Sequence, residues 1–176
     1  QNNSALKHLK NLKKVVRIAL ANDWIKKDPF YGIHFKQEEV NVEFLSREEL
    51  DVLMNKGFTI KRLEQVRDIF VFCCFTALAF VDVQQLSREH LIKDNNGTLW
   101  IRKARQKTNQ MCNIPVLSIP QRILRKYEDN AECIKKGVLL PVISNQRMNA
   151  YLKEIADLCS ITKRLSLIHI SEPTRR

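Results

Sequence analysis

The sequence predicts a mainly α-helical protein with one small antiparallel β-sheet. Apolar residues recur at helical spacing in several segments, and two β-prone segments flank a basic, polar stretch over residues 103–110. The 176 residues are 44% hydrophobic, which is enough for a buried core and excludes a disordered chain. This length allows one domain of ordinary size and part of another.

The first expected element is an amphipathic helix over residues 6–21. Its apolar side chains recur at helical spacing, with lysines on the opposite face: Leu9, Leu12, Val16, Ala19 and Leu20. The pair Asp28 and Pro29 ends helical geometry, because a residue before proline is pushed toward extended backbone. Residues 31–45 show no clear helical period and are expected to form an interdomain linker.

Two further helices are expected after the linker. Ser46 is followed three residues later by Glu49, which is the capping-box arrangement and predicts a helix that enters at Leu50. A long helix should then run over residues 61–78. Its core-facing stripe consists of Leu63, Val66, Ile69, Phe70, Cys73 and Cys74.

The rest of the chain predicts the sheet and the last helices. A short helix is expected from Asp82 to Leu86, then a turn at residues 94–97 and strands over residues 99–102 and 113–117. Helices are expected again over residues 120–127 and 145–158. The apolar stripe of the last helix consists of Met148, Leu152, Ile155 and Leu158.

The charge favours a polyanionic partner. The chain has 30 Lys and Arg against 19 Asp and Glu, for a net charge of +11. More than half of this excess lies within residues 1–36, which hold eight Lys or Arg and two Asp. A second basic patch, with no acidic residue inside it, consists of Arg102, Lys103, Arg105 and Lys107.

Neither disulfides nor a metal site is expected. The five cysteines are odd in number, have no CxxC spacing, and include an adjacent pair in an apolar run, which indicates reduced, buried thiols. The four histidines form no metal-ligand spacing with each other or with the cysteines. The chain starts at Gln1 and lacks a run of about eighteen apolar residues, so we expect an internal fragment of a cytoplasmic-type protein.

Three segments in the same order resemble the first half of the catalytic domain of tyrosine recombinases, the phage-integrase family: residues 72–86 (FCCFTALAFVDVQQL), 101–108 (IRKARQKT) and 144–156 (SNQRMNAYLKEIA). The resemblance is greatest to integrases of mobile elements of the Bacteroides group, of the conjugative-transposon type. It implies an incomplete fold of the DNA breaking-rejoining enzymes. It also implies four parts: the end of a helical core-binding, SAM-like domain (1–30), the linker (31–45), the N-terminal part of the catalytic domain (46–165) and an unrelated tail (166–176).

The resemblance places a catalytic arginine just after the long helix, within a TGLR-type segment. The matching residues here are Thr76, Ala77, Leu78 and Ala79, so alanine stands at both the glycine and the arginine position. A guanidinium suits this role because it can hold two phosphate oxygens as charge builds in the transition state. Asp82 falls where the family has an acidic residue, which we expect to serve the local architecture.

Lys107, in the segment RQKT, matches the β-hairpin lysine of the family. The resemblance implies that its ammonium protonates the departing 5′ oxygen of the cut strand, which a lysine can do if its surroundings tune its pKa. The alternative is that Lys107 is one of four cations on a solvated turn. By residue type Tyr151 is a candidate nucleophile, but it precedes the point where the family has its HxxR segment, and neither that segment nor a later tyrosine is present.

Site-specific DNA recombination by transfer of a phosphotyrosyl bond is the function that the resemblance implies. The implied partners are double-stranded DNA and three further subunits in a tetramer on paired sites, with no membrane, no cofactor and a cytoplasmic, nucleoid-associated location. The candidate DNA contacts are Lys10, Lys13, Lys14, Arg17, Arg102, Lys103, Arg105 and Thr108. Two alternatives stay open: a noncatalytic DNA-binding or regulatory module, and a helical interaction domain whose basic surface serves only solubility.

Overall fold

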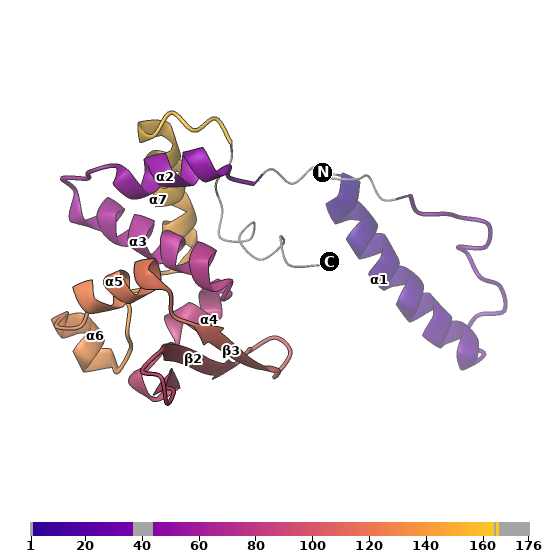
Figure 1. The fold of residues 1–176 in the computed structure, drawn as a ribbon. Coiled ribbons are helices and arrows are strands. Elements are labelled where there is room, and N and C mark those ends of the chain that lie inside the picture. Colours follow the sequence, from indigo (N-terminus) through magenta and orange to yellow (C-terminus); the bar gives the residue numbers. More distant parts are fainter. Residues whose placement is uncertain (1, 37–43, 164, 166–176) are drawn as a thin grey trace. The chain divides into compact units, whose positions relative to one another are not determined.

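The computed structural model describes residues 2–36, 44–163 and 165 (Figure 1). Contacts divide the chain into two compact units, residues 1–42 and 43–176. This boundary falls inside the predicted linker, of which residues 37–43 lie outside the described part. The predicted tail over residues 166–176 also lies outside the described residues.

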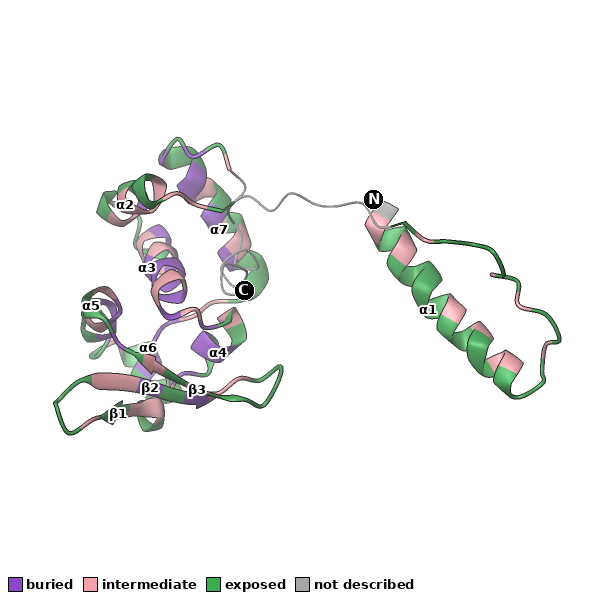
Figure 2. Cartoon of the chain, turned by 45° about the vertical axis from the view of Figure 1, so that its right-hand side comes forward, coloured by how far each residue is buried: buried purple, intermediate pink, exposed green. Residues whose placement is uncertain are grey.

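The first unit consists of α1 (Asn2–Ala21) and the turns that follow it. This helix confirms the predicted amphipathic segment and begins earlier. Figure 2 shows that most of its surface is exposed, and Leu12, Val15 and Ile18 each keep more than half of their surface exposed. Directly after the helix, the side-chain amide of Asn22 donates to the carbonyl of Ile18, and Asp23 turns into the left-handed region with φ of 57°.

The second unit is built around α3 (Lys61–Thr76), which packs against α2 (Arg47–Asn55), α5 (Ser118–Lys126) and α7 (Asn145–Leu158). Figure 2 shows α3 as the most enclosed of these helices. Its buried side chains include Leu63, Val66, Ile69 and Phe72, and each such side chain stabilises the fold by about 1.5–3 kcal/mol. The predicted long helix and its stripe are therefore confirmed, except that Cys74 is only half-buried.

Two other predicted helices are confirmed in detail. Ser46 caps α2 as a capping box, because its side chain accepts from the amide of Glu49 and the Glu49 carboxylate accepts from the amide of Ser46. The bounds of α7 match the predicted helix, and Met148, Leu152 and Ile155 are fully buried. Leu158 was expected in the same stripe, which is wrong: it is 47% exposed, because the next residue, Cys159, takes the inward position at 9% exposure.

The sheet has three antiparallel strands in the order β1 (Leu91–Lys93), β2 (Leu99–Ala104) and β3 (Met111–Pro115). The predicted small sheet is confirmed, but β1 was not predicted, because a three-residue strand has too little pattern to recognise. The helix α6 (Ala131–Lys136) was missed for the same reason, although Asn130 caps it with its side chain. The short helix α4 (Phe80–Gln84) begins and ends two residues before the predicted segment.

Candidate functional site

The turn between α3 and α4 is the first part of the candidate site. Thr76 closes α3: its buried hydroxyl donates to the carbonyl of Phe72 at 2.8 Å and accepts from the amide of Leu78 at 3.5 Å. Ala77 follows in the left-handed region, with φ of 51° and ψ of 22°. This conformation is one that glycine adopts without strain and that costs an alanine about 1–2 kcal/mol. The chain turns sharply here because of this residue.

Asp82 joins this turn to the hairpin between β2 and β3. Its side chain is 2% exposed, and its carboxylate accepts from the backbone amide of Gln106 at 3.0 Å. A buried carboxylate without such a donor would be costly, so this bond fixes where the hairpin starts. The acidic residue thus holds two segments together that are 24 residues apart, in line with the architectural role expected of it.

Arg105 makes a second link between the same two segments. One terminal nitrogen of its guanidinium, Nη2, donates to the carbonyl of Ala77 at 3.3 Å. The Nε of the same side chain is enclosed and has no hydrogen-bond partner; among the described residues it is the one buried side-chain nitrogen or oxygen in that condition. The guanidinium therefore lies beside the turn in which Ala79 occupies the arginine position.

The tip of the hairpin presents Lys107 and Thr108. The loop closes through hydrogen bonds from the amide of Arg105 to the carbonyl of Gln110 at 2.9 Å, and from the amide of Asn109 to the carbonyl of Arg105 at 2.8 Å. Asn109 takes the left-handed conformation that this turn requires, with φ of 54°. Lys107 and Thr108 are exposed, so the structure leaves both free to meet a ligand and leaves the solvated-turn alternative for Lys107 open.

Lys103 does not share this exposure. It is 8% exposed, and its Nζ lies 3.5 Å from the carbonyl oxygen of Gln85 and 3.2 Å from Nε2 of His90. The other ring nitrogen of His90 accepts from the amide of Ser87 at 3.1 Å. Lys103 was expected to contact DNA, yet its ammonium is directed into the fold, whereas Arg102 on the opposite face of β2 is exposed.

The remaining expected DNA contacts all lie on α1 in the first unit. Lys10, Lys14 and Arg17 are exposed, and Lys13 is half-buried with its Nζ 5.6 Å from the centroid of the Phe35 ring. We call Lys10, Lys13, Lys14 and Arg17 the helix patch, and Arg102, Lys103, Arg105 and Lys107 the hairpin patch. The four members of the hairpin patch lie on β2 and the turn after it, but Arg102 and Lys103 face opposite sides of the strand.

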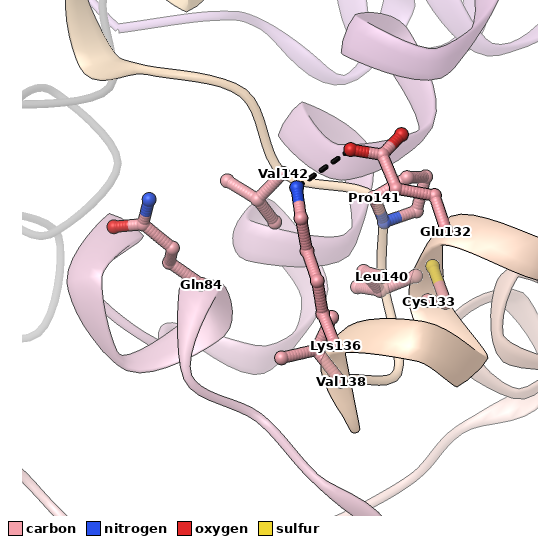
Figure 3. A pocket seen from close by; sticks show the side chains of 8 residues that line it. All are labelled: Gln84, Glu132, Cys133, Lys136, Val138, Leu140, Pro141 and Val142. Atoms are coloured by element: carbon pink, nitrogen blue, oxygen red, sulfur yellow. Dashed lines mark hydrogen bonds and ion pairs between the residues drawn. The ribbon is translucent and has the colours of Figure 1, made fainter.

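A separate cavity of about 270 Å³ lies between α4, α6 and the segment that follows α6 (Figure 3). Its lining includes Cys133, Leu140 and Val142, and Lys136 and Glu132, which also line it, pair at 2.6 Å. Burial raises the pKa of the Cys133 thiol, which keeps it protonated and weakly nucleophilic. The lining therefore has no activated thiol. As a functional site, the turn after α3 with the hairpin between β2 and β3 is the better candidate.

The tyrosines of the described residues have other positions. The hydroxyl of Tyr127 donates to the buried carboxylate of Asp68 at 2.9 Å, and burial raises its pKa well above the ordinary value. The ring of Tyr151 lies 5.3 Å from the guanidinium carbon of Arg62, and Tyr31 is 90% exposed. None of the three lies on the elements of the candidate site.

The described part of the chain contains neither a metal-binding cluster nor a membrane-spanning helix. Within residues 2–36, 44–163 and 165, no three His, Cys, Asp or Glu side chains are arranged to hold a metal ion. Every helix of that part is too short or too polar to span a lipid bilayer.

The inward direction of Lys103 was missed at the level of sequence, although the alternation of side chains along the strand gives a signal for it. Side chains alternate between the two faces of a strand, and Ile101 is the apolar residue that must face the core. Residue 103 shares its parity, so the buried Ile101 indicates that Lys103 points inward while Arg102 points out, whereas Arg105 lies in the turn beyond the end of β2.

The chain is similar to known proteins in the sequence of its N-terminal part and in its fold. Residues 1–46 match the family described as Phage integrase SAM-like domain. No curated protein has a sequence that matches the chain. The N-terminal unit thus carries a recognisable domain family, and it covers about a quarter of the chain.

Solved structures match over a larger part. A lambda integrase dimer bound to a COC′ core site has a TM-score of 0.69 at 12% identity, covering 92% of this chain and 59% of that one. XerH site-specific recombinase bound to a palindromic difH substrate, in a post-cleavage complex, has a TM-score of 0.56 at 14% identity, covering 72% and 39%. XerA recombinase has a TM-score of 0.53 at 9% identity, covering 92% and 65%.

The chain spans less than two thirds of each of these three structures. At such identities the similarity establishes the fold. The predicted fold class and the predicted resemblance to tyrosine recombinases are therefore confirmed, the latter by the fold and by the N-terminal domain family. The narrower resemblance to Bacteroides mobile-element integrases stays a prediction.

Proposed function

From the premise that the chain has the tyrosine recombinase fold and a phage integrase SAM-like domain, we propose that it is the DNA-binding first part of a site-specific recombinase. The reaction would be attack of a tyrosine on a phosphodiester, with the bond energy kept in a phosphotyrosyl link, so that no ATP is needed. The nucleophile would lie outside the residues present here, and this chain alone would bind DNA without cutting it.

The observation that carries the proposal is the convergence of two segments of the second unit. The hydrogen bonds from Gln106 to Asp82 and from Arg105 to Ala77 hold the basic hairpin against the turn after α3. A guanidinium contacts this turn, and the exposed Lys107 follows Gln106 directly in the hairpin, which is an arrangement that suits a phosphodiester. In this proposal Lys107 is the general acid, and it needs a phosphate nearby to tune its pKa.

The first unit would add contacts to the DNA backbone. Lys10, Lys13, Lys14 and Arg17 would neutralise phosphates, which gives affinity with little sequence information. Arg102 and Thr108 would do the same on the hairpin, while buried Lys103 serves the fold instead. The lambda integrase and XerH structures are described as bound to a COC′ core site and to a difH substrate. We extend DNA binding to this chain by that likeness, together with assembly as a tetramer and action on the bacterial nucleoid.

Binding to a labelled duplex of about 30 base pairs tests the proposal. The dissociation constant, measured by fluorescence anisotropy between 50 and 200 mM salt, should rise steeply, because released counterions drive the binding. A helical interaction domain with a merely solubilising surface predicts no such dependence. A dissociation constant that does not change with salt would therefore reject the proposal.

The alternative of a noncatalytic, regulatory module is favoured by one observation, which is alanine at position 79. Sequencing the source locus beyond the codon for Leu165 separates the two. An open frame that reaches HxxR and a later tyrosine supports the recombinase. A locus that ends at Arg176 supports the noncatalytic module.

A further inference from the structure

The outer face of the three-stranded sheet has a hollow of about 310 Å³, which we call the sheet hollow. It is lined by side chains of all three strands and of the turn after β1: Ile92, Asp94, Trp100, Arg102 and Asn113. Trp100 and Arg102 flank the buried Ile101 on β2, so alternation along the strand turns both away from the core. Ile92 is the cross-strand partner of Trp100. Asn113 is the partner of Arg102, so the strand register gathers the lining on one face.

The indole of Trp100 is held in place by the turn between β1 and β2. Its Nε1 donates to Oδ2 of Asp94 at 3.1 Å. The other carboxylate oxygen, Oδ1, accepts from the amides of Asn96 at 2.9 Å and Thr98 at 2.8 Å, so the turn fixes Asp94 as well. Trp100 is only half-buried. A half-exposed ring whose N–H is already bonded loses little freedom when a flat ligand stacks on it.

The polar side chains of the sheet hollow are available to a ligand. Arg102 and Asn113 are exposed, and within the described residues neither side chain makes a hydrogen bond or an ion pair. A guanidinium offers a planar fork to a phosphate, and an amide offers donors and an acceptor to the edge of a base. The volume is near the lower end for small-molecule sites, which suits one ring system and excludes a duplex. A fixed aromatic ring beside an arginine and an amide is typical of sites for unpaired bases.

We propose that the sheet hollow binds one unpaired base of DNA, with Trp100 stacked on the base, Asn113 hydrogen-bonded to its edge and Arg102 bound to its phosphate. This inference rests on the proposed function, which already gives Arg102 a phosphate, and deepens it. A recombinase that joins a cut strand to another duplex must take bases near the cut out of their pairs. A surface on which such a base can stack offsets part of the cost of unpairing.

Trp100 itself reports the binding. The chain has two tryptophans, and Trp24→Phe, at a side chain that is 74% exposed, leaves Trp100 as the single indole. In this background an oligothymidylate of about six nucleotides should quench the fluorescence of Trp100 in a saturable way, because a base stacks on the ring. An abasic phosphodiester of the same length has the same charge and should not quench it. Equal quenching by both would overturn the proposal, since charge alone would then explain the binding.

Variants of the lining test the same site through the affinity for labelled oligothymidylate, measured by anisotropy. Trp100→Ala should weaken binding by at least about fivefold, whereas Trp100→Phe keeps an aromatic face and most of the affinity. Asn113→Ala should weaken binding by about threefold, and it keeps the half-buried ring, so it tests the site even if Trp100→Ala fails to fold.

Arg102→Ala and Arg125→Ala form a matched pair for the charge. Both arginines are exposed, but Arg125 lies on α5, outside the sheet hollow. Arg102→Ala should weaken oligothymidylate binding by about fivefold, and Arg125→Ala by less than about twofold. Equal losses in the two variants, or unchanged binding in both folded Trp100→Ala and Asn113→Ala, would overturn the proposal.

Duplex binding separates failure of this site from failure of the proposed function. Quenching of Trp100 by oligothymidylate, in a chain whose affinity for a duplex does not change with salt, would reject the proposed function and keep the base site. Salt-dependent duplex binding without quenching of Trp100 by oligothymidylate would reject the base site alone.

Discussion

The helix patch and the hairpin patch have the same residue types but use their charges differently. Within the first unit, Lys10, Lys14 and Arg17 project from a helix with little apolar cover. In the hairpin patch, Lys103 is buried and Arg105 is tied to the turn after α3, while Arg102 and Lys107 stay exposed. A basic segment of sequence therefore does not form one surface, because alternate side chains of a strand face the core and the solvent.

The second unit also buries a charged side chain outside the hairpin, and changing this residue, Asp68, should have the largest effect on stability. Its carboxylate, 8% exposed, accepts from Arg67 at 2.9 Å, from Lys126 at 2.7 Å and from the hydroxyl of Tyr127 at 2.9 Å. Asp68→Ala leaves these donors without their acceptor, so the free energy of unfolding should fall by about 3 kcal/mol in urea denaturation.

The matched control for Asp68 is Glu154→Ala. Glu154 pairs with Arg62 at 3.3 Å, and the two side chains are 39% and 50% exposed. This change should lower the free energy of unfolding by less than about 1 kcal/mol. An equal fall in the free energy of unfolding in both variants would mean that the buried charges of the second unit stabilise it no more than its exposed ion pairs do.

Lys103→Ala and Lys14→Ala test the two patches against each other with two readouts. Lys103→Ala should cost about 1 kcal/mol of unfolding free energy and leave the salt dependence of duplex binding unchanged, because its Nζ is buried. Lys14→Ala should change stability by less than about 0.5 kcal/mol and lower the slope of log K against log salt by about 1. The reverse pattern would show that exposure does not decide how these cations are used.

Much of the fold could be predicted from local pattern, whereas the site depended on pairing across the sheet. The capping box at Ser46 and the stripe of α3 are written in consecutive residues, so both were predicted correctly. The link from Asp82 to Gln106 joins residues 24 apart, and no spacing rule indicates which amide the carboxylate will meet. The burial of Lys103 is only partly of this kind, since alternation along β2 indicates the direction of its side chain but not what packs against the inner face.

Ala77→Gly sharpens the account of the turn that holds the hairpin. Glycine removes the strain of the left-handed conformation but loses more backbone entropy on folding, so the net gain should be about 0.5–1 kcal/mol. Ala150→Gly is the control, because Ala150 lies exposed in α7, and there the same change should cost about 1 kcal/mol. A loss of stability in both variants would mean that Ala77 carries no strain.

The smallest expected effect concerns Lys163, a partly exposed lysine of the second unit that is hydrogen-bonded to the fold. Lys163 donates to the Glu49 carboxylate at 2.8 Å and to the carbonyl of Phe44 at 3.1 Å. The hydrogen bond from Lys163 is the main cause of a lowered pKa of Glu49, and the amide of Ser46 adds to it. Since the folded pKa lies below the unfolded one, the contribution to stability is present above about pH 4.5 and is lost as the pH falls through the folded value.

Glu49→Gln should therefore flatten the pH dependence of unfolding in the acid range. Between pH 6 and pH 3 the free energy of unfolding of the parent chain should fall by a few tenths of a kcal/mol more than that of the variant, as expected for a partly exposed pair. Asp94 also has a lowered pKa, mainly because of the indole N–H of Trp100, and it is unchanged in both proteins, so only the difference between the curves is informative. Parallel curves would show that Lys163 adds nothing to the fold through Glu49.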